Sequence, residues 1–464
     1  MKHLRNRRDF LRDSTLAGIG FWVAGGVSPA APLGANDKIG IACIGVGGKG
    51  SSDTMDAGKI GNVVALCDID DDRLNQMATH FTKAKKYNDF RKMLEEMGSS
   101  IDAVTVSTPD HTHAAASMMA MKMGKHVYCQ KPLTHTVYEA RMMRETAAKQ
   151  KVATQMGNQG TAENGLRRAV EVIQSGVIGP VKEIHVWTNR PIWPQAPEVK
   201  ARPDPSPAPA GVHWDEFLGP APHRPFAYYP PDAKGNRKGA YHPFAWRGWW
   251  DFGTGALGDM ACHTANMAFM ACKLGYPTSV SAEAGDVNPE TCPSWATVTL
   301  EFPARGELPA LKWFWYEGKR NGHKNLPPHE LLHGENPPGS ASLVVGEKAI
   351  LYSPNDYGAD SRFLGKNAKD VEAAAKKVAE SLPRNGKGDP GQKEEWVRAI
   401  RANDPKIALS NFAYAGMLTE SVLLGNVAIR CGKKFEWNGP EFKAVGCPEA
   451  DQYLRTEYRK GWTL

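Results

Sequence analysis

A glycine-rich turn near the start of the chain has the spacing that binds a dinucleotide pyrophosphate. It follows a continuous apolar run at 39–44 and reads Gly45-Val46-Gly47-Gly48-Lys49-Gly50. In a GxGxxG turn between a strand and a helix, the first glycine permits the tight turn, the second admits the pyrophosphate, and the third lets helix and strand pack closely. The N-terminus of the helix offers free N–H groups to the phosphates. We therefore assign Gly45, Gly47, Gly48 and Gly50 to nucleotide binding.

A carboxylate stands where the adenosine ribose of NAD is expected. A second apolar run at 63–67 ends in Asp68, about 20 residues beyond the glycine motif, as in dinucleotide-binding folds. A carboxylate there accepts a hydrogen bond from the ribose 2′-hydroxyl and repels a 2′-phosphate, so the sequence favours NAD over NADP. The alternative interpretation makes Asp68 a helix N-cap or turn residue, and Asp70 is a second candidate for the ribose.

A further pair of residues has the chemistry needed to oxidise a hydroxyl-bearing carbon. Asp259 and His263 follow a glycine-rich stretch at 253–258 and are spaced to share one face of a helix. A neutral imidazole can accept the hydroxyl proton because its pKa lies near working pH, and Asp259 would orient it or hold a substrate hydroxyl. The alternatives are a metal pair or an ordinary helix face. Zinc needs more ligands than are evident nearby, so we expect no metal site.

The elements that must position these residues alternate between strands and helices. Strand patterns at 103–107 and 127–129 continue the series begun by the first two apolar runs, with a helix expected at 110–123 between them. This order predicts a doubly wound parallel sheet, in which ligands bind beyond the carboxyl ends of the strands. The residues at those ends are Thr108, Pro109, His113, Gln130 and Lys131.

These motifs taken together resemble the Gfo/Idh/MocA (glucose–fructose oxidoreductase / inositol dehydrogenase) family. The resemblance rests on Thr108-Pro109, His113, Gly124-Lys125-His126-Val127 and Lys131-Pro132. The family motif is usually Glu-Lys-Pro, and its lysine contacts the substrate hydroxyl. Lys131 matches that lysine, whereas Gln130 replaces the carboxylate with an amide. By this resemblance Thr108, Pro109, His113 and Gln130 contact the cofactor NAD, and Lys131 stabilises the developing alkoxide.

The resemblance also implies an α/β architecture of two domains. We expect a signal peptide at 1–35, an NAD-binding Rossmann domain at 36–157, and an α+β domain at 158–464. The second domain should carry a large, mostly antiparallel sheet that often forms an oligomer interface, so a homo-oligomer is expected. It should begin with Asn158, assigned to substrate, and a helix at 162–174 capped by Thr161, and segments 191–240 and 318–390 should be insertions.

Aromatic residues are dense between 191 and 251, where prolines interrupt any periodic pattern. Aromatic rings stack on sugar C–H faces, and arginine or aspartate side chains bind hydroxyl groups. We therefore assign four residues to a carbohydrate substrate, namely Trp246, Arg247, Trp249 and Asp251. The alternative is a loop packed over the core by its own aromatic rings.

The N-terminus resembles a twin-arginine export signal. Arg7-Arg8 precedes Phe10-Leu11 and an apolar, glycine-containing run at 16–27, which is too short for a confident membrane span. Export by the twin-arginine machinery to the periplasm is expected, and a basic tail or an uncleaved anchor is the alternative. The formal net charge of +7 over 464 residues does not suggest nucleic-acid binding. The eight cysteines form no CxxC pair, and their pairing stays open.

Three functions follow from these features. Export of a folded protein implies that NAD is loaded beforehand, retained and regenerated in place. The chain is then an NAD(P)-dependent oxidoreductase acting on a sugar, glycoside or polyol, or a redox-neutral NAD-retaining glycosidase, lyase or epimerase. The third possibility is a non-catalytic sugar- or nucleotide-binding protein, which Lys131, Asp259 and His263 argue against. The roles of Lys131 and His263 as base and alkoxide stabiliser are interchangeable at this stage.

Overall fold

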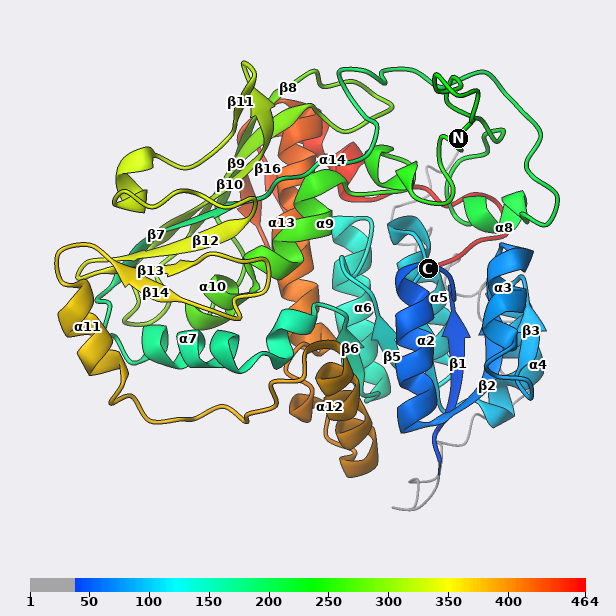
Figure 1. Ribbon diagram of the computed structural model, residues 1–464, viewed down its shortest axis with the longest axis horizontal. Helices are drawn as coiled ribbons and strands as arrows, with labels where there is room; N and C mark the ends of the chain where they lie inside the picture. Colours follow the sequence, from blue (N-terminus) through cyan, green and yellow to red (C-terminus); the bar gives the residue numbers. More distant parts are fainter. Residues whose placement is uncertain (1–37) are drawn as a thin grey trace, which may run out of the picture. The chain divides into compact units, whose positions relative to one another are not determined.

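The computed structural model describes residues 38–464, which belong to one compact unit. The expected twin-arginine signal and its cleavage site lie outside the described residues. Figure 1 shows two regions, one built on each of two sheets.

The N-terminal region is a six-stranded parallel sheet with strand order β3-β2-β1-β4-β5-β6 (Figure 1). This is the predicted doubly wound sheet, with helices between successive strands. The strands are β1 Gly40–Ile44, β2 Asn62–Cys67, β3 Lys85–Tyr87, β4 Ala103–Val106, β5 His126–Cys129 and β6 Thr154–Met156. The helices are α2 Lys49–Ile60, α3 Asp71–Ala78, α4 Phe90–Met97, α5 Asp110–Lys122 and α6 Val137–Gln150.

Burial on both faces explains why these strands read as continuous apolar runs. Every residue of β1 and of β4 is buried, as expected for a parallel sheet covered by helices. Helix α6 starts with a capping box, in which the Thr136 hydroxyl accepts from the Glu139 N–H and the Glu139 carboxylate accepts from the Thr136 N–H. The local sequence thus fixes both the strands and where the helix begins.

The C-terminal region is a ten-stranded sheet, mostly antiparallel as predicted. Its order is β14-β13-β12-β7-β10-β9-β8-β15-β16, with β11 paired to β10, and β7 runs parallel to β10. The strands are β7 Val181–Trp187, β8 Ser279–Gly285, β9 Trp295–Phe302, β10 Leu311–Arg320, β11 His323–Lys324, β12 Ala341–Gly346, β13 Ile350–Ser353, β14 Arg362–Leu364, β15 Phe435–Asn438 and β16 Lys443–Val445. The helices are α7 Asn164–Gln174, α8 Trp214–Leu218, α9 Gly255–Thr264, α10 Asn266–Ala271, α11 Ala368–Ala375, α12 Gly388–Ala402, α13 Phe412–Cys431 and α14 Pro448–Leu454.

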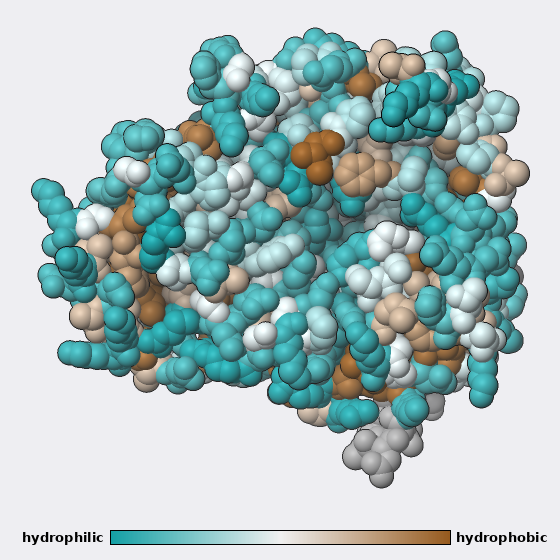
Figure 2. Space-filling model, in the orientation of Figure 1, coloured by the Kyte–Doolittle hydropathy of each residue, from teal (hydrophilic) through white to brown (hydrophobic). Residues whose placement is uncertain are grey.

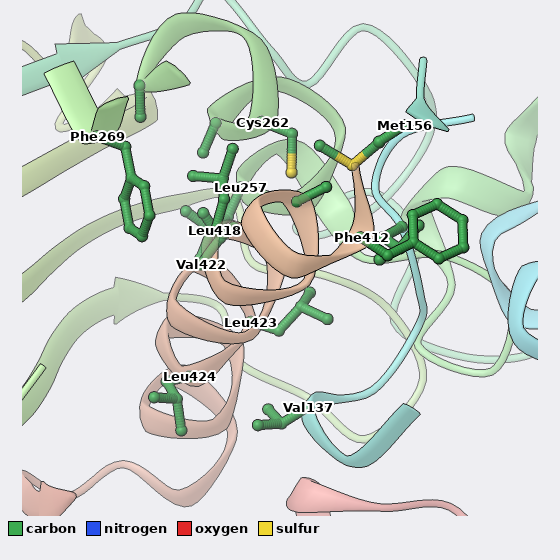
Figure 3. Close-up of a cluster of buried hydrophobic side chains, with 14 of the residues drawn as sticks. Val137, Met156, Leu257, Cys262, Phe269, Phe412, Leu418, Val422, Leu423 and Leu424 are labelled. Carbon is green, nitrogen blue, oxygen red and sulfur yellow. The ribbon is translucent and has the colours of Figure 1, made fainter. Parts of the chain in front are cut away.

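Helix α13 is the central element of the core that joins the two regions. It packs against α6, α9 and β8, and Figure 3 shows its leucines among side chains from several other elements. The helix has 20 residues and is long and apolar enough to cross a membrane, but 83% of its most apolar 18-residue stretch is buried inside the protein. The composition of α13 is therefore that of a core helix. The molecular face drawn in Figure 2 is mainly hydrophilic, with apolar residues in small separate groups.

One local expectation for the C-terminal region is wrong. Thr161 does not cap α7, because a short 3-10 turn at 159–162 precedes the helix and the Thr161 hydroxyl donates to the Asn158 carbonyl. Within segment 318–390, strands β12 to β14 extend the large sheet beside β7. All eight cysteines are free thiols.

Candidate active site

A cavity of about 550 Å³ brings the glycine-rich turn and the predicted catalytic residues together. Gly45, Gly47 and Gly48 line it, and so do Lys131, Asp259 and His263. The first three precede α2 at the carboxyl end of β1, whereas Asp259 and His263 lie on α9 in the other region. The cavity thus lies where the ends of the parallel strands face α9, the position where open α/β sheets bind ligands.

The glycine-rich turn has the shape of a pyrophosphate cradle. Gly45 has a φ of +77°, and a Cβ on Gly50 would lie 1.9 Å from the Gly45 carbonyl oxygen, so the first and third glycines are required by backbone shape. Helix α2 begins at Lys49 without a side-chain cap, and the Gly50 and Ser51 N–H groups donate to the Gly47 and Gly48 carbonyls. The Gly48 and Lys49 N–H groups are left for a ligand. These residues fit a dinucleotide phosphate, with Gly50 acting through packing and the other glycines through the cavity wall.

Asp68 and Asp70 have different surroundings, and the difference distinguishes the two ribose candidates. Asp68 lines the cavity, and its carboxylate accepts hydrogen bonds from the Val46 and Gly47 N–H groups at 2.8 and 3.1 Å. Asp70 instead caps α3 and accepts from His242 Nε2 at 2.9 Å. The N-cap role therefore belongs to Asp70. Burial raises the pKa of Asp68 against the lowering effect of these backbone hydrogen bonds.

Lys131 and Asp259 form the centre of the site. Lys131 Nζ donates to Asp259 Oδ1 at 2.8 Å and to the Asp259 carbonyl at 2.7 Å. Burial favours the neutral form of Asp259, but attraction to Lys131 and Arg247 outweighs it and lowers the pKa of the carboxyl. The pair is therefore ionised, and Lys131 presents a fixed positive charge to the cavity.

His263 is a neutral hydrogen-bond acceptor facing the same cavity. It is 6% exposed, and its Nδ1 atom has no hydrogen-bond partner among residues 38–464. Burial and the nearby Lys131 charge lower its pKa well below the ordinary value. The ring stacks edge-on against Tyr357, with ring centroids 5.1 Å apart. A buried polar atom without a partner is costly; Nδ1 itself is shielded, whereas other atoms of the ring line the cavity where a substrate hydroxyl would lie.

The comparisons with known proteins agree with this site. Residues 39–158 match the model described as "Oxidoreductase family, NAD-binding Rossmann fold", and residues 163–307 match its C-terminal alpha/beta domain. The chain belongs to the Gfo/Idh/MocA oxidoreductase family. As a family member it is an NAD-binding oxidoreductase with an N-terminal Rossmann domain.

Individual relatives of this Gfo/Idh/MocA protein are distant. Myo-inositol 2-dehydrogenase of Thermotoga maritima is 27% identical over 28% of this chain and 38% of its own. A glycosyl hydrolase family 109 protein of Saccharopolyspora erythraea is 29% identical over 38% of this chain and 44% of its own. This chain thus spans less than half the length of either relative. The WlbA dehydrogenase of Bordetella pertussis, solved with NADH and UDP-GlcNAcA, has the same fold, with a TM-score of 0.59 at 14% identity over 87% of this chain and 99% of that chain.

The departure from the family's Glu-Lys-Pro motif has a structural reason. Gln130 Nε2 donates to Asp53 Oδ2 at 2.8 Å, and Asp53 is fully buried. A glutamate at position 130 would place a second carboxylate against Asp53. Asp53 is in turn paired with Lys49 at 2.8 Å and with Lys393 at 2.9 Å. The amide therefore belongs with a buried ion network that links α2 to α12.

Several predicted contact residues lie in the cavity wall. Besides the residues already described, these are Thr108, Pro109, Gln130, Trp246 and Arg247.

Four predicted contacts lie outside the cavity, and each is a correction. His113 is buried with both ring nitrogens on backbone carbonyls, and Asn158 is buried with its amide on the Cys262 carbonyl. Trp249 is fully buried in an aromatic core cluster, and Asp251 is paired with Arg224. Trp249 and Asp251 thus serve the packing of the loop, which is the alternative interpretation for segment 191–251.

The sequence also left important cavity residues unassigned. Arg190 follows β7, and Asp356 and Tyr357 lie between β13 and β14 within 318–390. Tyr357 accepts a hydrogen bond from Gln159 at 3.1 Å and covers His263. The position of Arg190 at a strand end was a usable signal, whereas no local pattern marks Asp356 or Tyr357.

Proposed function

We propose that this chain is an NAD-dependent dehydrogenase that oxidises a hydroxyl group of a sugar, glycoside or polyol. The observation that carries the proposal is the neutral His263 ring in the wall of the cavity that Lys131 and the glycine-rich turn also line. A base, a fixed cation and a nucleotide cradle in one cavity are the parts that carbinol oxidation needs.

The surroundings of the two candidate groups favour one division of roles. His263 is neutral, and its ring takes the hydroxyl proton. Lys131 is held charged by Asp259 and donates to the oxygen as negative charge develops on it. The nucleotide supplies the hydride acceptor. Asp68, Thr108, Pro109 and Gln130 are placed to hold it, and Asp68 favours NAD because its carboxylate would repel a 2′-phosphate.

The test is a panel of sugars, glycosides and polyols given to the purified protein without added nucleotide. Nicotinamide absorbance records reduction, and chromatography identifies the product. A keto product formed with one equivalent of NADH per site supports dehydrogenation. Failure of every compound to reduce NAD, in protein shown to contain it, would remove the proposal.

Retention of the nucleotide is part of the proposal, and α12 gives it a physical basis. Lys49, at the first position of α2, donates to Asp389 of α12 at 2.5 Å and to Asp53 at 2.8 Å. Lys393 of α12 is fully buried and pairs with Asp53. The C-terminal region thereby holds the turn that cradles the phosphates, and opening the cradle requires breaking these ion pairs.

Replacing one partner of this link tests retention. Asp389→Asn should increase the rate at which NAD leaves by roughly 10-fold, since a charge-assisted hydrogen bond is worth about 1.5–3 kcal/mol. Exposed Asp370 of α11 offers the control Asp370→Asn. Release is followed by mass spectrometry of the filtrate, and equal release from both variants would show that α12 does not retain the nucleotide.

A second function is supported by the relatives named glycosyl hydrolase family 109 proteins. A transient ketone acidifies the neighbouring C–H group and permits elimination of a glycosidic group, after which the hydride returns. This redox-neutral glycosidase, lyase or epimerase activity would use the same Lys131 and His263. Release of a sugar or aglycone with no net NADH identifies it in the same panel.

Export and self-association complete the proposal. The Arg7-Arg8 motif supports twin-arginine export to the periplasm, which cell fractionation of the full chain with and without an Arg7→Lys, Arg8→Lys pair would test. Helices α9 and α13 cover one face of the large sheet, while alternate residues of β9 on the other face are only half-buried. That face supports a homo-oligomer, and light scattering of the purified protein tests it.

A further inference from the structure

Asp259 is surrounded by more positive charge than one carboxylate can neutralise. Lys131 Nζ takes Oδ1 at 2.8 Å, Arg247 Nε lies 3.6 Å from Oδ1, and Arg190 Nε lies 3.9 Å from Oδ2. Only the lysine is within hydrogen-bonding distance, so the two guanidinium groups are attracted to Asp259 without being bound by it. All three cations line the cavity.

Buried arginines elsewhere in the fold are hydrogen-bonded directly to carboxylates. Arg141 donates to both oxygens of Glu420 at 2.6 and 3.0 Å, and Arg167 donates to Glu395 at 2.7 Å. Each of these buried guanidinium groups donates a hydrogen bond directly to a carboxylate, as expected where leaving a buried charge unpaired is costly.

Arg190 and Arg247 donate to neutral oxygen atoms instead of to a carboxylate. Arg190 donates to the Asn189 amide oxygen, and Arg247 donates to the Phe244 carbonyl at 3.3 Å. Among residues 38–464, neither forms an ion pair with Asp356, another carboxylate that lines the cavity. Most of their N–H donors therefore remain available to a ligand.

Asp110 does not neutralise the excess positive charge around Asp259. Its carboxylate lines the cavity and accepts from the Thr254 N–H and hydroxyl at 3.1 and 2.7 Å. Burial raises its pKa to about 7, so near neutral pH it carries only part of a charge. The substrate side of the cavity consequently has a surplus of positive charge.

The wall around Arg247 is also rigid and partly apolar. The Arg247 guanidinium lies 4.2 Å from the Trp246 ring centroid and 4.7 Å from that of Phe244, which holds the planar group in one orientation. Phe244 is 46% exposed and Ile192 is 61% exposed, although both line the cavity. A planar cation beside an exposed apolar surface suits a sugar ring that carries an acidic group.

We propose that the substrate is an acidic sugar, whose carboxylate or sulfate group is bound by Arg190 and Arg247. This inference rests on the proposed dehydrogenase function, because it places the hydroxyl to be oxidised at Lys131 and His263. The anionic group of the substrate then accepts hydrogen bonds from the two guanidinium groups, which lie too far from Asp259 to donate to its carboxylate.

The experiment compares matched probes on the NAD-loaded protein. The probes are D-glucuronate, D-galacturonate and D-glucose 6-sulfate, each beside its neutral parent D-glucose or D-galactose. Binding is measured by calorimetry, and nicotinamide absorbance is followed separately in a single turnover. We expect at least one anionic sugar to bind 10-fold or more tighter than its neutral parent, with the difference shrinking as salt is raised.

Variants assign the effect to the two arginines. Arg190→Gln and Arg247→Gln should each reduce the preference for the anionic probe by about 10-fold, and Arg190→Lys should restore part of it. Arg320→Gln is the control, since Arg320 pairs with Glu283 at the exposed end of β10. Thermal unfolding and nucleotide content of every variant establish that it is folded and loaded.

The outcomes separate this inference from the function on which it rests. Preferential binding of glucuronate, galacturonate or the sulfate ester supports it and shows which group is recognised. Neutral sugars that bind as well as every anionic probe, or no binding of any anionic probe, overturn it, even when a neutral sugar is oxidised. Arginine-dependent binding without hydride transfer from any sugar keeps the anion site but removes the dehydrogenase proposal.

Discussion

Two clusters of charged side chains adjoin the cavity, and they are built on different principles. The α2–α12 cluster consists of Lys49, Asp53, Asp56, Asp389 and Lys393, and the α9 cluster consists of Lys131, Arg190, Arg247 and Asp259. In the first, Lys393 lies 2.9, 3.3 and 3.6 Å from three carboxylates. In the second, three cations share one carboxylate.

The difference shows which cluster is complete within the protein. Every cation of the α2–α12 cluster has a carboxylate partner, and attraction to Lys393 and Lys49 lowers the pKa of Asp53 although burial opposes ionisation. The α9 cluster has one carboxylate for its three cations and adjoins His263, whose Nδ1 has no partner among residues 38–464. A satisfied cluster holds elements together, whereas an unsatisfied one is ready for a ligand.

The largest expected effect is a loss of hydride transfer when the catalytic groups at the α9 cluster are removed. Lys131→Met and His263→Ala should each slow hydride transfer by about 10²–10⁴-fold, the usual worth of general acid–base assistance. Single-turnover absorbance at the nicotinamide band measures the loss. Both residues act on one hydroxyl, so the double variant should lose much less than the product of the two.

Nucleotide binding is the control for these variants, since neither residue belongs to the glycine-rich turn. Mass spectrometry of denatured protein should find NAD in both. If both reduced bound NAD at the parent rate, the active-site assignment would be wrong.

The next-largest effect is a loss of stability when the α2–α12 cluster is broken. Lys393→Met leaves Asp53 and Asp56 without their buried cation and should lower the free energy of unfolding by about 3–5 kcal/mol. Lys387→Met, which removes an exposed pair with Glu394, should cost no more than about 1 kcal/mol. Denaturant unfolding compares them, and equal losses would show that the cluster contributes nothing special.

Measuring the free energy of unfolding as a function of pH tests the protonation of Asp110, which lies beside the α9 cluster. Its pKa is about 7 in the folded protein and about 3.9 in an unfolded chain. Between these values the unfolded state is ionised and the folded state is protonated. Asp110 therefore lowers stability by about 1.4 kcal/mol per pH unit as pH rises from 4 to 7, and the loss is complete above 7.

The variant Asp110→Asn removes this titration and keeps an oxygen for the two Thr254 bonds. Its unfolding free energy relative to the parent should therefore increase from pH 4 to pH 7. Parallel stability curves for parent and variant would contradict the raised pKa.

The smallest effect concerns nucleotide choice. Asp68→Ala should weaken NAD binding by about 1.5–3 kcal/mol, the value of a hydrogen bond to a charged group, and relax discrimination against NADP. Arg73 also lines the cavity and would then face a 2′-phosphate without the Asp68 carboxylate. Titration of nucleotide-free protein with NAD and NADP tests this, and unchanged affinities would assign the ribose to another residue.

The nucleotide half could be predicted from the sequence because its information is local. A strand, the turn from Gly45 to Gly50 and a helix follow one another directly, and the backbone of the turn itself makes the cradle. The sequence likewise specified the parallel sheet and the helical spacing of Asp259 and His263. Each depends on periodicity within a single element.

Tertiary structure decided what the substrate side contains. Lys131 and Asp259 are 128 residues apart in sequence, and Arg190 and Tyr357 reach the same cavity from two further segments. Trp249 and Asp251 have the same residue types as true site residues, yet they are buried in packing and ion pairing. Amino-acid type and spacing cannot tell these cases apart, because whether a polar or aromatic side chain meets a ligand or the core depends on which distant segments cover it.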